Sequence, residues 1–161
     1  HFSPPSWNNC VEYFEGVGYS MMSYFDSVAS PTYSEFAIAR YIEESSIKDL
    51  FSFEKYLKKK ALKNLLDEED ELVDQDTLEL KLPGKFSRVL YIEAKDLNAG
   101  NKGKADYLLV RSVFSVLVVE KENKQKVYEF IYSERGKPEE LWNRKDFTCR
   151  AEDFLSTIQL H

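Results

Sequence analysis

The placement of histidine limits the chemistry open to this 161-residue sequence. Its only two histidines, His1 and His161, are the terminal residues, where chains are least ordered. Serine and cysteine nucleophiles paired with histidine, and the usual catalytic zinc sites, need an imidazole among ordered side chains. The two cysteines are too few for a four-ligand structural zinc site. We therefore expect no metal and no cofactor, and any catalysis would have to use carboxylate, lysine or tyrosine groups.

Four acidic residues in or beside predicted strands are the candidates for such carboxylate chemistry: Glu93, Asp96, Asp106 and Glu129. Paired carboxylates can act as general acid and base once a fold brings them together. Acidic residues that alternate along a strand are also the ordinary pattern of a solvated sheet face. We expect these side chains to point inward and assign none of them as catalytic.

Glycines and lysines between residues 98 and 104 suggest an anion-binding loop, because converging amides and lysine side chains both attract phosphate. The spacing is not that of a P-loop. Asn98 stands where the first glycine of that motif is expected, and Ala105 stands where the motif has the Ser or Thr that binds magnesium. A polar hairpin loop is the simpler interpretation. Lys102 and Lys104, with Arg135 and Lys137, are the predicted basic binding residues.

The residues at 105–133 organise the predicted fold as a hairpin of two long antiparallel strands. β-branched and aromatic residues fill both arms around a short polar turn at 122–125. The first arm is apolar on both faces, so each face needs a cover. On the second arm, Tyr128 and Tyr132 share one face and would line an apolar pocket if that face were open.

Three helices are predicted before this sheet, over residues 7–28, 33–44 and 50–66, from apolar residues at helical spacing. Lysines form the outer face of the third helix and are predicted to be solvated. Residues 67–71 are a predicted acidic connector, and alternation from Thr77 predicts the first strand. Further strands are predicted at 86–94 and 147–150, with a helical turn presenting Trp142. Residues 151–160 are consistent with either a helix or an edge strand.

The expected fold is therefore a single α+β domain over residues 1–161, with a helical portion at 1–74 and a sheet portion at 77–161. Three N-terminal helices would pack on a curved antiparallel β-meander. This outline is similar to the cystatin-like and nuclear-transport-factor-like folds. Those folds host enzymes, carriers and binding modules alike, so the outline does not select a function.

Residues 88–110, RVLYIEAKDLNAGNKGKADYLLV, resemble the opening of a C2 domain. Asp96 and Asp106 match common positions of that family. Gly100 stands where the first calcium-binding aspartate is expected, and the proline that usually follows the second aspartate is missing. The resemblance implies an eight-stranded fold and a peripheral membrane function.

Charge and cysteine content limit the partners and the cellular compartments that the sequence is compatible with. The formal net charge is −6, and the first 76 residues carry 7 basic and 15 acidic side chains, so nucleic-acid binding is not expected. No stretch is apolar enough to span a bilayer. Cys10 and Cys149 would close a long disulfide loop or remain free buried thiols. The sequence begins with His, so we expect a removed N-terminal segment and a soluble protein, with secretion or organelle import left open.

Three functions are compatible with these observations. The favoured one is a non-catalytic protein-interaction module that presents a sheet face or edge, with Trp142 and the basic residues above as binding residues. The first alternative is a small-ligand carrier or carboxylate enzyme with an apolar pocket between sheet and helices. The second is a peripheral membrane module containing the C2-like stretch.

Overall fold

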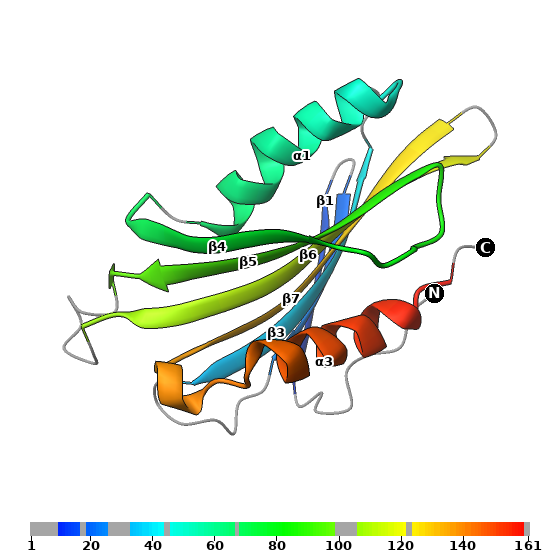
Figure 1. Ribbon diagram of the computed structural model, residues 1–161. Helices are drawn as coiled ribbons and strands as arrows, with labels where there is room; N and C mark the ends of the chain where they lie inside the picture. The colour runs from blue at the N-terminus through cyan, green and yellow to red at the C-terminus, as the bar shows by residue number, and fades with distance from the viewer. Residues whose placement is uncertain are drawn as a thin grey trace.

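The computed structural model describes residues 10–16, 19–25, 33–43, 46–66, 68–98, 106–121 and 124–159. They form an α+β fold, as expected, built on one antiparallel sheet (Figure 1). Its strands are β1 (Cys10–Gly16), β2 (Tyr19–Phe25), β3 (Ser34–Glu43), β4 (Asp70–Leu78), β5 (Phe86–Asp96), β6 (Leu108–Lys121) and β7 (Lys124–Gly136). The helical elements are α1 (Leu50–Leu65), the 3-10 turn η1 (Pro138–Glu140) and α3 (Arg144–Ser156).

The strand order, β1-β2-β3-β7-β6-β5-β4, explains the shape of the molecule. Each neighbouring pair is antiparallel. Two meanders, β1 to β3 and β4 to β7, join where β3 pairs with β7. The chain leaves β3 through α1, crosses one face of the sheet and starts the second meander at the opposite edge. Figure 1 shows α1 on one side of the sheet and α3 on the other.

Two apolar cores follow from this layering. Beneath α1, the buried side chains of the helix and sheet are Ile47, Phe53, Tyr56, Leu57, Leu90, Phe114, Val116, Val118, Val127 and Ile131. Beneath α3, they include Val89, Tyr91, Val113, Leu117, Phe130, Tyr132, Phe147, Ala151, Phe154 and Leu155. Alternate residues of β5, β6 and β7 feed the two cores, because successive strand side chains point to opposite faces.

The hairpin predicted at 105–133 is confirmed as β6 and β7, whose register runs from Leu109↔Gly136 to Lys121↔Lys124. Both faces of β6 are covered, one by α1 and one by α3, as its two apolar faces require. The helix predicted at 50–66 is confirmed as α1 and the strand at 86–94 as β5.

The prediction of three N-terminal helices is wrong. Residues 10–25 form the strands β1 and β2, and residues 34–43 form β3, so α1 alone matches that prediction among the described residues. Aromatic and β-branched residues are frequent in all three strands, and both favour extended backbone. In β3 the spacing of apolar residues also matches a helix, because this strand has apolar side chains on both faces. Ala37 and Ala39 are buried on one face, and Phe36 and Ile38 pack on the other.

Other boundaries also differ from the expectations. The predicted acidic connector contains the start of β4, whose acids are tolerated because it is an edge strand. Residues 147–150, expected to be a strand, belong to α3. Of the two structures considered for residues 151–160, helix is the one observed, up to Ser156. Asn143 caps this helix, accepting a 3.0 Å hydrogen bond from the Asp146 amide. The C2-like stretch covers β5 and the beginning of β6, within a single seven-stranded sheet instead of the implied eight strands.

Candidate functional site

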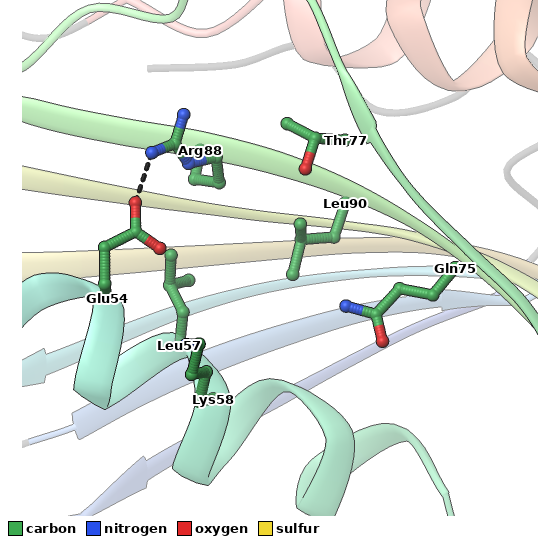
Figure 2. A pocket seen from close by; sticks show the side chains of 7 residues that line it. All are labelled: Glu54, Leu57, Lys58, Gln75, Thr77, Arg88 and Leu90. Atoms are coloured by element: carbon green, nitrogen blue, oxygen red, sulfur yellow. Dashed lines mark hydrogen bonds and ion pairs between the residues drawn. The ribbon is translucent and has the colours of Figure 1, made fainter.

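A groove of ≈ 400 Å³ lies between α1 and the β4–β5 edge of the sheet. Figure 2 shows its seven lining side chains, which are Glu54, Leu57 and Lys58 of α1, Gln75 and Thr77 of β4, and Arg88 and Leu90 of β5. Leu57 and Leu90 are buried and give the groove an apolar floor. Its rim is polar, so an occupant could combine an apolar contact with hydrogen bonds.

An ion pair crosses one end of the groove, where Arg88 donates to the carboxylate of Glu54 (Figure 2). The pair joins the helix to the sheet, and both side chains are partly solvated. Lys58 on α1 and Gln75 on β4 also line the space. The groove therefore has charged and amide groups around an aliphatic base.

A second hollow of ≈ 450 Å³ adjoins the first at the end of β4, and Thr77 and Arg88 line both. The chain turns away from the sheet after Leu78, which is the last β4 residue paired with β5. Phe86, Ser87 and Arg88 consequently pair with β6 but have no partner on their other side among the described strands. The open edge thus runs along β4 and continues onto β5.

The β4 edge carries exposed apolar side chains at Leu72 and Val73, which are 44% and 47% exposed. The register shifts between Leu72 and Asp74, which indicates a bulge at Val73. Beyond the bulge, Gln75 and Thr77 point to the α1 face, while Asp74 and Asp76 point to the α3 face and bind Arg144 at 2.7 and 2.8 Å. The edge is accessible, and its α3-face acids are already engaged.

A buried polar network lies on the α3 face and is centred on Glu35 of β3. Arg150 of α3 donates to both oxygens of this carboxylate, at 2.8 and 3.1 Å. The hydroxyls of Tyr132 and Tyr33 also donate to it. Burial opposes the charge on Arg150, but the hydrogen bonds and charges of Glu35 and Tyr132 together outweigh burial and raise the pKa of this guanidinium. This carboxylate anchors α3 to the sheet and is fully occupied by donors.

Glu134 and Glu93 form the neighbouring half of the network through Arg111. The Arg111 Nε donates to Glu93 at 2.6 Å, and an Nη lies 3.4 Å from Glu134. Burial raises the pKa of Glu134 to about 7, although Arg111 and the backbone amide of Trp142 oppose the shift. The pKa of Glu93 falls because hydrogen bonds from Arg111 and Tyr91 outweigh its desolvation. A perturbed acid is a common mark of an active site, but Glu134 lines neither of the two hollows described above.

The α1 face holds a further buried carboxylate at the centre of the sheet. Glu129 has no exposed surface, forms an ion pair with Arg40 of β3 and accepts a hydrogen bond from the Tyr56 hydroxyl of α1. Asp96 on the same face pairs with Arg135. These contacts tie strands and helix together, and they indicate a structural role for the acids.

Of the four acids predicted to point inward, Glu129 and Asp96 are buried and Glu93 is half-buried, while Asp106 is exposed. They do not meet in one site, because Glu93 lies on the α3 face and the two buried acids lie on the α1 face. No group of three or more His, Cys, Asp or Glu residues within the described ranges could hold a metal ion.

The structure describes three of the five predicted binding residues. Lys102 and Lys104 lie outside the described residues, Arg135 is paired with Asp96, and Lys137 starts η1 with its amide bonded to Glu140 at 2.9 Å. Trp142 is exposed and stacks under the Arg150 guanidinium at 4.8 Å. Arg135, Lys137 and Trp142 do not line the α1 groove.

The two tyrosines proposed as pocket lining face α3. Tyr132 is buried against Phe147 and Phe154, and the Tyr128 ring packs at a tilt against Tyr41 with ring centroids 5.5 Å apart. Neither tyrosine lines the α1 groove.

The disulfide considered as one alternative for Cys10 and Cys149 is not seen. Cys149 is a free, exposed thiol on α3, and the side chain of Cys10 lies outside the described set. The alternative of two buried thiols is likewise wrong for Cys149, because its side of α3 faces solvent.

Sequence reasoning missed Glu35, Glu134, Arg111 and Arg150, which hold the α3-face network. Glu35, Ala37 and Ala39 lie at every second position and are all buried, which is the spacing of one face of a strand. No local sequence pattern predicts the groove, because α1 and β4 come together only when the chain crosses the sheet between β3 and β4.

Comparison with known protein families and with curated protein sequences gives no match. Among the described helices, none has the length and hydrophobicity needed to cross a bilayer. Interpretation of the groove and the β4 edge therefore rests on their geometry.

Proposed function

We propose that this protein is a non-catalytic interaction module that binds an extended segment of a partner protein along the β4 edge. The segment would add an eighth strand next to β4, with backbone hydrogen bonds supplying affinity. Side chains on alternate positions would enter the α1 groove and supply specificity. The supporting observation is that an open strand edge and a hollow with an apolar floor lie side by side.

The distribution of charged groups supports binding over catalysis. The buried carboxylates Glu35 and Glu129 are each bound by a guanidinium group and a tyrosine hydroxyl, which supports a structural role for both. At the edge, Arg144 has neutralised the acids of the α3 face, which leaves the α1 face of β4 as the side where partner side chains are selected. An aliphatic side chain fits against Leu57 and Leu90 there.

Both sheet faces are covered near the centre, which favours the edge over the face within the interaction hypothesis. A small-ligand carrier is the second candidate, because a volume of ≈ 400 Å³ is within the range of small-molecule sites. The two candidates differ in their backbone contacts, because only an added strand would form hydrogen bonds with the backbone amides of β4.

Selection of random 12-residue peptides displayed on phage against the immobilised protein tests the proposal. Hydrogen exchange with the enriched synthetic peptide should then slow at β4 amides. Thr77→Trp fills the groove and should weaken peptide binding at least tenfold, whereas Glu69→Trp, on the exposed turn before β4, should leave it within twofold. Equal affinity for both variants, or protection elsewhere without protection at β4, would contradict strand addition.

A further inference from the structure

One row of exposed side chains runs along the outside of α1 at a spacing of four residues. It begins with an aromatic residue and continues with lysines, and we call it the α1 ridge: Phe51, Lys55, Lys59 and Lys63. Residues four apart are neighbours on a helix surface, so these side chains form a continuous strip about 18 Å long. Phe51 is 80% exposed, and the adjacent Leu50 is 55% exposed.

The position of the helix makes this strip an outer surface. Phe53, Tyr56 and Leu57 bury the opposite side of α1 against the sheet. Figure 1 shows α1 as the outermost layer on its side of the sheet. The ridge is convex and lacks the walls of the neighbouring groove, so it suits a broad surface better than a single side chain.

The lysines of the ridge are not paired with acidic side chains in the part of the chain that the structure describes. Lysines four apart repel each other and weaken a helix. Glu54 is turned toward Arg88 across the groove. Asp49, the nearest acid at the start of the helix, is engaged with Ser52 at 2.7 and 2.8 Å. The ammonium groups of the ridge are therefore open to an external partner, although the acidic residues 67–71 follow the end of the helix.

We propose that the α1 ridge docks the protein on an anionic phospholipid surface, with Phe51 inserted at the level of the headgroups. A helix face of lysines with an aromatic residue is the usual composition of an interfacial helix. Lysine attracts diffuse negative charge, whereas protein interfaces favour arginine and are depleted of lysine. The basic residues of α1 are all lysines.

This surface is independent of the peptide edge proposed above, because the ridge residues do not line the groove. The overall charge of −6 limits the attraction to this strip and makes docking weak and sensitive to salt. One aromatic anchor with three lysines corresponds to reversible association, as for other two-signal membrane contacts.

Sedimentation with vesicles of phosphatidylcholine containing about 30% phosphatidylserine, compared with pure phosphatidylcholine, tests the proposal. The protein should bind the anionic vesicles only, and about 0.5 M salt should release it. Replacing the ridge lysines (K55Q/K59Q/K63Q) should lower the partition coefficient about a hundredfold, since each lysine contributes about fivefold. Phe51→Ser should lower it about tenfold.

A variant with the same change in net charge provides the matched control. Lys81, Lys137 and Lys145 are not part of α1, and K81Q/K137Q/K145Q should bind within about threefold of the wild type. Equal loss in this control, or no binding of the wild type to anionic vesicles, would overturn the proposal. Binding to poly-glutamate without binding to anionic vesicles would also overturn it, by assigning the ridge to an acidic protein. Circular dichroism would verify that all variants fold.

Discussion

Glu35 and Glu134 lie directly opposite each other across the β3–β7 pair, and both are buried. Like charges at such positions repel. Each carboxylate faces a different cation, since Arg150 binds Glu35 and Arg111 approaches Glu134. The two contacts are unequal: Arg150 reaches Glu35 at 2.8 Å, whereas Arg111 lies 3.4 Å from Glu134 and also serves Glu93. Burial raises the pKa of Glu134 to about 7, because the distant Arg111 only partly offsets it.

The stability of the protein should therefore fall as pH rises from about 4.5 to 7. The folded state holds the Glu134 proton up to a pKa of about 7, while the unfolded chain releases it near 4.5, so the native state binds more protons in this window. The loss should be on the order of 3 kcal/mol, at about 1.4 kcal/mol per pKa unit. Urea unfolding at pH 5, 6, 7 and 8 measures it.

Glu134→Gln should flatten this dependence, because the amide does not titrate. The exposed Glu69→Gln should retain the wild-type slope. Glu93 does not obscure the result: its pKa is lowered, so its contribution is complete above about 4.5 and is lost only in stronger acid. A slope that persists in Glu134→Gln would show that another group carries the proton.

Removing the guanidinium that faces Glu35 should strongly destabilise the fold. Arg150→Met leaves a buried carboxylate with tyrosine donors but no cation, and losing one partner of such a pair costs about 3 kcal/mol. The double variant Glu35→Gln/Arg150→Met should regain part of this loss, since the uncompensated charge is gone. Chemical denaturation of the single and double variants gives the coupling energy.

Lys145→Met, an exposed change on the same helix, should alter stability by less than about 0.5 kcal/mol. A comparable loss in this control would attribute the effect to α3 helicity and not to the ion pair. Additive single losses would likewise contradict a direct coupling between Glu35 and Arg150.

The contrast between the two halves of the sheet explains which elements could be predicted. In β6, apolar residues on both faces and a short polar turn leave a paired central strand as the simplest arrangement, and the structure agrees. In β3, the same two-sided pattern over ten residues also matches a helix. Periodicity alone does not separate a buried strand from a helix, and here the wider sheet decided between them.

The candidate site depended on contacts that local sequence does not contain. Arg150 and Glu35 are 115 residues apart, and only the packing of α3 on β3 joins them. The α1 groove exists because the crossover places β4 at the far edge, where Thr77 lies beside a helix that precedes it in the chain. The lysines of α1 were visible in the sequence, but their alignment with exposed Phe51 required the buried face of the helix to be known.

Cys149 should react rapidly with a thiol reagent in the native protein, because it is exposed and free. Ellman's reagent should modify Cys149 without denaturant, so Cys149→Ser should remove one rapidly reacting thiol per chain. The melting temperature should not change on addition of a reducing agent. A wild-type protein with no native thiol, and a melting temperature that falls on reduction, would indicate a disulfide instead.

Gly84 should be hard to replace, because the chain turns there into β5 with a φ of +133°. A Cβ at this position would lie 2.9 Å from the carbonyl oxygen of Val118. That oxygen accepts a 2.7 Å hydrogen bond from the amide of Lys85, so it cannot move away without losing the contact that begins β5. Gly84→Ala should therefore lower the free energy of unfolding by about 1–3 kcal/mol, measured by urea denaturation. Lys81→Ala, an exposed change in the same segment, should have little effect, and equal midpoints for the two variants would contradict the steric argument.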